Sequence, residues 1–154
     1  FEAGEAMVDV RLGGWDTLGL HARAIRTAVF IEEQQIPVEM EWDEADAHCL
    51  HAVAFNRFGL PLATGRLLPH APGVARIGRM ASIQAVRGSG VGRKVLDALM
   101  QAAKLRGDRE VLLHAQTSAR AFYARAGFVP TGPVFDEAGI AHIEMTRALS
   151  LCSA

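Results

Sequence analysis

Cysteine is scarce in this 154-residue chain, which has only Cys49 and Cys152. Two cysteines so far apart form neither a disulfide framework nor a Cys-x-x-Cys pair of the kind that binds metal or cycles between redox states. Such sparing use of cysteine suits a reducing compartment, and we therefore expect a cytoplasmic protein.

Long apolar runs and an excess of one charge are also missing. No apolar stretch approaches the roughly 18 residues that cross a bilayer, and the acidic start FEAGEAMVDV lacks the basic region of a signal peptide. The 16 Lys and Arg residues nearly balance the 17 Asp and Glu residues, which gives a formal net charge of −1. Because no global field attracts a polyanion, we expect neither nucleic acid nor a membrane as partner.

The remaining composition is that of a globular protein, with 50% apolar and 21% charged residues. A chain of 154 residues fits one domain, residues 1–154, with a real core. Leaving out residues 1–6, hydrophobic periodicity predicts helices at 18–33, 91–106 and 117–127, and strands at 7–12, 48–56, 60–70, 74–83, 109–115, 128–135 and 140–149. This order predicts a mixed α/β domain with helices packed on a central sheet.

The segment RGSGVGRKVL, residues 87–96, has three glycines at alternate positions directly before an amphipathic helix. Free N–H groups at a helix start favour an anion, and a glycine lets phosphate oxygens approach the main chain because it has no Cβ. The spacing is neither that of a dinucleotide-binding G-x-G-x-x-G nor that of a P-loop. The alternative is a tight strand-to-helix connection, which needs fewer glycines, so we favour a phosphate site flanked by Arg87, Arg93 and Lys94.

Four segments match the pattern of one known family. Residues 87–92, RGSGVG, fit Q/R-x-x-G-x-G/A, and the preceding IGRMASIQAV reads as the strand before that motif. TSARAFYARAGFVPTG fits A-x-x-F-Y-x-x-x-G-F, and AVFIEEQQIPVEMEWDEAD fits a subgroup of small bacterial members. The sequence thereby resembles the GNAT superfamily of acyl-CoA-dependent N-acetyltransferases over essentially its whole length. The resemblance implies a GNAT-like α/β fold, with a mixed central sheet of six or seven strands flanked by helices.

The resemblance also implies acetyl-coenzyme A as co-substrate. Backbone N–H groups of residues 87–93 would hold the pyrophosphate, and the end of the fourth strand would pair with the pantetheine arm. An N–H at Ala81 or Ser82 would polarise the thioester carbonyl. The residues implied to contact coenzyme A are Met80, Ala81, Ser82, Ile83, Arg87, Gly88, Ser89, Gly90, Val91, Gly92, Arg93, Ser118 and Phe122, of which Phe122 equally fits a core position.

Tyr123, the only tyrosine, is the candidate catalytic residue. The resemblance implies that it protonates the departing thiolate, which is chemically sound because a phenol of pKa near 10 is protonated at neutral pH. The alternative is an aromatic anchor that packs its helix on the sheet. The surrounding F-Y-x-x-x-G-F pattern favours the acid.

The segment from Glu32 to Asp46 holds seven carboxylates and no Lys or Arg. In the family this region walls the acceptor site, and an acidic rim would attract a cationic amine. We therefore predict a substrate-binding set of Glu32, Glu41, Trp42 and Asp43. A solvated acidic loop, with Trp42 as its anchor, is an equally good interpretation.

The six histidines do not indicate a metal site. His48 and His51 would point to opposite faces of an alternating strand, so they could not chelate together, and we expect no metal. His70 and His114 lie near strand ends that could border the site. Either could accept a proton, although a lone histidine in a strand is more often structural.

These patterns predict an acyltransferase that moves an acetyl group from acetyl-coenzyme A to a primary amine. The expected mechanism is direct attack in a ternary complex, since no cysteine with a base partner lies in the implied site. The acceptor, a small molecule or a protein or peptide amine, stays open, and so does a homodimer. One rival is an acyl-CoA-binding module without turnover. Another is a structural or interaction protein whose glycine turn is only a turn.

Overall fold

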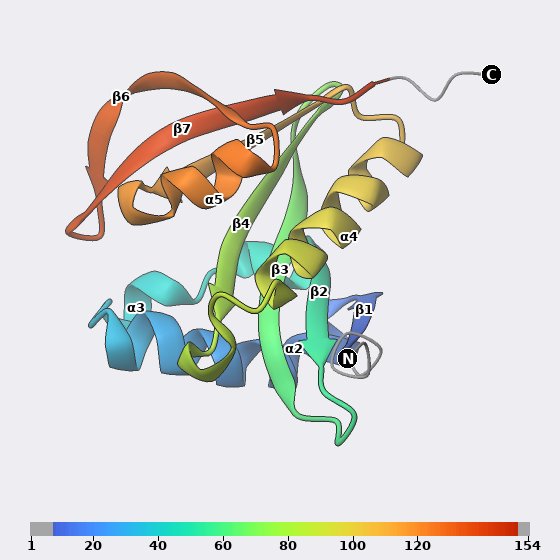
Figure 1. Cartoon of the computed structure of the whole chain (residues 1–154), viewed down its shortest axis with the longest axis vertical. Helices are drawn as coiled ribbons and strands as arrows, with labels where there is room; N and C mark the ends of the chain where they lie inside the picture. The colour runs from blue at the N-terminus through green and yellow to red at the C-terminus, as the bar shows by residue number, and fades with distance from the viewer. Residues whose placement is uncertain (1–7, 151–154) are drawn as a thin grey trace.

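A single seven-stranded sheet, in the order β1-β2-β3-β4-β5-β7-β6, organises the computed structural model of the protein, which describes residues 8–150 (Figure 1). The strands are β1 (Asp9–Gly13), β2 (Leu50–Phe55), β3 (Pro61–Ala71), β4 (Val74–Ser82), β5 (Glu110–Gln116), β6 (Val129–Glu137) and β7 (Ile140–Ala148). The helical elements are α2 (Trp15–Arg26), η1 (Thr27–Glu33), α3 (Val38–Glu41), η2 (Glu44–His48), η3 (Gln84–Val86), α4 (Val91–Leu105), η4 (Thr117–Ala119) and α5 (Arg120–Arg125).

Alternation along β2 separates two hydrophobic cores on opposite faces of the sheet. Ala52 and Ala54 pack in the larger core with the apolar face of α4, whereas Val53 and Phe55 pack in the smaller core against α2. In Figure 1, α4 accordingly lies in front of β3 and β4, while α2 lies behind them. This arrangement follows from side chains pointing to opposite faces at successive strand positions.

The pairing between β4 and β5 is short. All other neighbouring strands are antiparallel, but β4 and β5 are parallel, and only Val74 to Ile77 pair with Glu110 to Leu113. Beyond Ile77 the two strands diverge, and β5 continues with β7 and β6 as a separate wing of the sheet (Figure 1).

A β-bulge bends β4 just after it leaves β5. Arg66 pairs with Gly78 and Thr64 with Ala81, so Arg79 and Met80 together face the single residue Gly65. Arg79 has a φ of +52°, a left-handed conformation that is uncommon for a residue with a side chain. Bulges of this kind bend the strand and change where its groups point.

The predicted element order, the mixed α/β fold and the flanking helices are confirmed, and the sheet has seven strands. The helix expected at 18–33 is instead α2 followed by a π-helix, η1, which shifts the buried face so that the adjacent residues Val29 and Phe30 are both buried. The helix expected at 117–127 begins as the 3-10 turn η4. Residue 7 of the first predicted strand lies outside the described residues, and the single-domain extent of 1–154 stays a prediction.

The close approach at the bulge makes Gly65 a sensitive position. A Cβ added there would clash with Met80 Sδ and lie 2.8 Å from Leu99 Cδ1, so we expect Gly65→Ala to lower the free energy of unfolding by about 1–3 kcal/mol. Gly132→Ala is the matched control, because an added Cβ there meets nothing within 4 Å, and its effect should stay within about 0.5 kcal/mol. Urea denaturation of both variants checks this, and equal stabilities would contradict it.

Candidate active site

Two clefts open on either side of the gap between β4 and β5. The first, of about 690 Å³, is bordered by η1, α3, β4, β5 and the turn between β6 and β7. The second, of about 600 Å³, is bordered by the end of β4, the glycine turn, η4 and α5. They share the lining residues Met80, Ala81, Ser82, Arg87, Ser118, Ala119 and Tyr123. The clefts therefore meet where β4 has left β5.

The glycine turn presents bare backbone to the second cleft. Gly88 and Gly90 have φ values of +82° and +91°, and a Cβ added at either would meet no atom within 4 Å. Gly90 is the N-cap of α4, whose first helical hydrogen bond runs from Lys94 N–H to Gly90 C=O. The first N–H groups of the helix have no acceptor within it. This turn is a cradle that fits a pyrophosphate.

Gly92 has a different role. A Cβ there would lie 3.1 Å from Ser82 Oγ and 3.7 Å from Phe122 Cζ, so this glycine allows the start of α4 to pack closely on β4 and α5. Three predicted cofactor residues line neither cleft. Val91 is buried in the core, Ile83 packs between both cores, and Ser89 Oγ donates to Val86 C=O.

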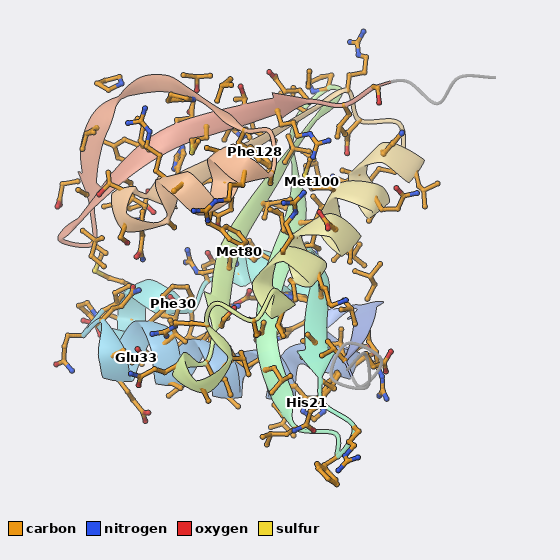
Figure 2. All side chains as sticks on the ribbon, viewed as in Figure 1. His21, Phe30, Glu33, Met80, Met100 and Phe128 are labelled. Atoms are coloured by element: carbon orange, nitrogen blue, oxygen red, sulfur yellow. The ribbon has the colours of Figure 1, made fainter. Side chains whose placement is uncertain are left out.

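Two side-chain contacts link the end of the first helical segment to the two sides of the gap, one to Arg87 after β4 and the other to Gln116 of β5. Arg87 forms a bidentate ion pair with Glu33 of η1, at 2.6 and 2.8 Å, and this hydrogen bonding lowers the pKa of Glu33. Gln34 and Gln116 exchange reciprocal amide hydrogen bonds of 2.8 and 3.2 Å. In Figure 2, Glu33 and Phe30 lie on the opposite side of the gap from Phe128, with Met80 between them.

The register of β3 and β4 determines which backbone groups of β4 are free. Ile83 N–H donates to Leu62 C=O, so these two residues are a hydrogen-bonded pair. Bonded and non-bonded pairs alternate in an antiparallel ladder, which makes Thr64 and Ala81 a bonded pair and leaves Ser82 facing away from β3. Consistently, Ser82 C=O accepts from Arg87 Nε at 3.1 Å. Ser82 N–H is therefore directed toward the gap.

Tyr123 lies where the two clefts meet, and it also packs in the larger core. Its ring is edge-on to Phe122 at 5.0 Å and to Phe128 at 6.0 Å. Burial raises the pKa of the Tyr123 phenol, so it stays protonated at neutral pH. Within residues 8–150 its hydroxyl makes no hydrogen bond. The location of Tyr123 fits a proton donor, and its packing fits an aromatic anchor, so both interpretations agree with the structure.

The acidic segment does not form an uncompensated rim. Arg26, buried in α2, donates to Glu41 and Asp46 at 2.7 Å each, and Arg66 donates to Asp43 at 2.7 Å and Asp46 at 2.9 Å. Three arginines thereby face three carboxylates, the third being Arg79, whose Nε lies 3.4 Å from Glu41 Oε2. Sequence reasoning missed these arginines because they lie outside the segment. The sequence did contain a sign of the network, since Arg26 falls on the apolar face of α2 beside Ala22 and Ile25 and a buried charge there needs a partner.

Protonation in this network follows burial and pairing. The hydrogen bonds from Arg66 lower the pKa of Asp43 to about 2. Burial raises the pKa of Glu41 despite its bond from Arg26. Both residues line the first cleft, whereas Glu32 and Trp42 line neither cleft. Trp42 packs against the guanidinium of Arg26, 4.8 Å from its ring centre, which favours the anchor interpretation.

The histidines are distributed differently from expectation. His114 lines the first cleft, while His70 is exposed at the far end of β3. His48 lies in η2 rather than on a strand, so the alternation argument was wrong for it, and His51 is buried against Asp46 C=O at 2.8 Å. No group of three or more His, Cys, Asp or Glu within residues 8–150 could hold a metal ion. Cys49 is buried outside both clefts, and Cys152 lies outside the described residues.

Comparison with known proteins identifies the family. Residues 31–149 match the Acetyltransferase (GNAT) domain family. The chain belongs to this family. It is 33% identical to the uncharacterized N-acetyltransferase YjcF of Bacillus subtilis, over 80% of this chain and 87% of that protein, and 31% identical to ElaA of Escherichia coli, over 80% and 82%.

Solved structures agree with this GNAT assignment. An acyl-CoA N-acyltransferase from Pseudomonas aeruginosa is 36% identical with a TM-score of 0.80, covering 92% of this chain and 99% of that one. Escherichia coli ElaA superposes with a TM-score of 0.81 at 26% identity and the same coverage. The resemblance inferred from the sequence motifs is confirmed, and with it an acyltransferase fold that uses acyl-CoA. None of the helices in residues 8–150 is long and apolar enough to cross a membrane.

The arginine–carboxylate network makes a testable contribution to stability. Arg26→Met would leave Glu41 and Asp46 buried without their main partner, so we expect a loss of about 3–5 kcal/mol in the free energy of unfolding. Arg11→Met is the control, because Arg11 and Asp9 form an exposed pair worth about 0–1 kcal/mol. Denaturant titration of both variants is the measurement, and a loss below about 1 kcal/mol for Arg26→Met would contradict the assignment.

Proposed function

We propose that this GNAT protein transfers an acetyl group from acetyl-coenzyme A to a primary amine by direct attack in a ternary complex. The observation that carries the proposal is the meeting of two clefts at Met80–Ser82 and Tyr123. One cleft has the glycine cradle and the other does not, so two substrates can approach one point from opposite faces of the sheet.

The residues of the second cleft suit coenzyme A. The backbone of Gly88 and Gly90, the start of α4, and the cations Arg87 and Arg93 would hold its pyrophosphate. Bound there, it supplies an activated thioester carbonyl. The free Ser82 N–H supports the choice of this residue over Ala81 as the donor that stabilises negative charge on the carbonyl oxygen.

Tyr123 would donate its proton to the sulfur that leaves. The phenol is protonated at neutral pH, so it has a proton to give to the thiolate that develops beside it. Its packing against Phe122 and Phe128 fixes the ring, so the hydroxyl is preorganised at the junction. The assignment needs no covalent intermediate, and the side chains that line the two clefts include no cysteine.

A screen of primary amines for release of free thiol from acetyl-coenzyme A tests the proposal. Amine-dependent release supports transfer. Calorimetric binding of coenzyme A without release by any amine would favour a binding module, and no binding would favour a structural role.

A substitution in the glycine turn should weaken coenzyme A binding, and this effect can be separated from the backbone strain that the substitution causes. Gly90→Ala and Gly107→Ala both place a Cβ on a left-handed backbone, at φ +91° and +93°, on opposite ends of α4. Each should cost about 1–2 kcal/mol of stability. Only Gly90→Ala should weaken coenzyme A binding, at least tenfold or about 1.4 kcal/mol by calorimetry. If the two folded variants bind coenzyme A with equal affinity, the glycine turn is not part of the binding site.

The proton donor predicts a large kinetic effect with little change in stability. Tyr123→Phe keeps the packing of the ring and removes the hydroxyl, so kcat should fall about 10²–10⁴-fold while coenzyme A affinity is retained. Phe128→Leu is the packing control, because the Phe128 ring contacts Tyr123 and lines neither cleft. It should lower the melting temperature and leave kcat nearly unchanged. A stable Tyr123→Phe variant with wild-type kcat would leave Tyr123 as an anchor only.

A further inference from the structure

One arginine of the first cleft has no carboxylate partner in the part of the chain that the structure describes. Arg66, Arg79 and Arg87 all line this cleft, and each lies within 3.4 Å of a carboxylate oxygen. Arg76 of β4 lines it as well, but its guanidinium makes one hydrogen bond only, to His114 Nδ1 at 3.1 Å. A guanidinium carries several N–H donors, so most of those of Arg76 have no acceptor in the protein.

The guanidinium of Arg76 lies where β4 and β5 separate. The neighbouring Ile77 points into the larger core, so Arg76 points to the opposite face of the sheet, toward the first cleft. Ile77 is also the last residue of β4 that pairs with β5, opposite Leu113. The bond to His114 draws the guanidinium one position further along the strand. Its charge is therefore level with Gly78, where the gap begins.

Gly78 leaves the floor of the first cleft open. A Cβ added there would meet no atom within 4 Å, and the backbone of Gly78 is not in the left-handed region. Neither packing nor backbone conformation therefore requires a glycine at this position. A glycine inside a strand weakens it, and it often marks a place where a ligand approaches the backbone closely. Gly78 lines the first cleft and not the second, so the bare strand suits a ligand other than coenzyme A.

The distance from Arg76 to the junction of the two clefts determines the length of such a ligand. Gly78 and Ser82 are four positions apart in β4, which corresponds to at most about 13 Å of extended strand. The bulge at Arg79 and Met80 shortens this distance. A molecule that reaches from Arg76 to the thioester therefore has several bonds between its reacting group and its anionic group.

The charges around Arg76 suit a carboxylate better than a phosphate. A guanidinium and a carboxylate form two parallel hydrogen bonds, and one positive charge then meets one negative charge. Arg66 and Arg79, in the same cleft, are already paired in the arginine–carboxylate network. Glu137 Oε1 lies 3.3 Å from the His114 nitrogen that Arg76 contacts, and its charge would repel a phosphate dianion more strongly than a carboxylate.

We propose that Arg76 and the bare strand at Gly78 bind the carboxylate end of the acceptor, so that the acceptor is an amine with a carboxylate several bonds away. The inference rests on the proposed function, because it assigns the substrate class of that reaction. Arg76 is thereby a specificity-determining residue, which contacts the substrate away from the reacting atoms.

The kinetic test compares amino carboxylates of increasing length, each with its uncharged amide. The probes are 4-aminobutyrate, 6-aminohexanoate and 8-aminooctanoate, assayed by release of thiol from acetyl-coenzyme A. At the length that fits, the wild type should prefer the carboxylate by about 10–100-fold in kcat/KM, and Arg76→Gln should abolish this preference. Arg57→Gln, at an exposed arginine outside both clefts, is the control and should keep it. Equal use of carboxylate and amide by the wild type overturns the proposal.

A substitution at Gly78 tests the path between the two ends of the acceptor. The side chain of Gly78→Val would stand on the floor of the first cleft, so kcat/KM for the preferred carboxylate should fall about tenfold or more, with coenzyme A affinity retained. Gly132→Val is the matched control, because an added Cβ there also meets nothing within 4 Å and Gly132 lines neither cleft. Equal kcat/KM in the two folded variants overturns the path over Gly78.

An acidic acyl group would also bring a carboxylate into the cleft, and the acyl donor tests this source. The carboxylate of succinyl-coenzyme A lies only a few bonds beyond the reacting carbonyl, which is short for the distance to Arg76. We expect Arg76→Gln to leave the ratio of kcat/KM for succinyl- and acetyl-coenzyme A unchanged. A preference for the succinyl donor that disappears in Arg76→Gln overturns the assignment to the acceptor.

A binding readout that needs no turnover completes the test. In protein saturated with coenzyme A, titration with hexanoate should shift the Nε–H NMR signal of Arg76 and leave that of Arg57 unchanged. Absent shifts in protein that still binds coenzyme A overturn the carboxylate site and leave the proposed function intact. Absent coenzyme A binding overturns the proposed function, and this inference with it.

Discussion

The short parallel pairing of β4 with β5 is the constraint on which the site depends. A strand that leaves its neighbour exposes backbone N–H and C=O groups, which are costly to leave without a partner. After Ile77 these groups of β4 face the gap, and only some find partners in the protein, such as Ser82 C=O with Arg87. The remaining polar backbone, between two clefts, is suited to a partner that brings amide groups of its own.

The arginine–carboxylate network supports this geometry from one side. Arg79 adopts a left-handed conformation at the bulge, which costs energy for a non-glycine residue. Its guanidinium donates to Glu41 C=O at 3.1 Å, and Glu41 is bound in turn to Arg26 of α2. The strained residue of β4 is thus connected to the helix behind the sheet. Because the network is electrically balanced, it shapes the wall of the first cleft without adding net charge to it.

The sequence predicted the fold well, for physical reasons that are local, and the candidate cofactor residues that it named lie in short segments. Strand and helix order follow from hydrophobic periodicity, and the glycine turn, Arg87 and Tyr123 lie within short contiguous motifs. The bulge at Arg79 has no such signal, because the strain depends on pairing with Gly65 and on contacts with Glu41.

The contacts on the wing of the sheet depend instead on strand register. His114 meets Glu144 because β5 and β7 pair at that position, and Glu137 reaches it from the turn that joins β6 to β7. A single sequence does not determine such alignments across 20 to 40 residues. Arg26 was the exception that local reasoning could have found, since a charge on an apolar helix face requires a buried partner.

The two contacts that link the first helical segment to the sides of the gap differ in how they respond to the surrounding solution. Glu33 and Arg87 are partly exposed charges, so dissolved salt screens their attraction. Gln34 and Gln116 are neutral amides, and their reciprocal bonds keep their strength across ionic strengths and across the pH range in which carboxylates titrate. The separation of η1 from β5 is therefore set by a contact that carries no charge. A rise in ionic strength would weaken the ion pair of Arg87 with Glu33, while the hydrogen bond from Arg87 to Ser82 C=O and the amide contact between Gln34 and Gln116 would persist.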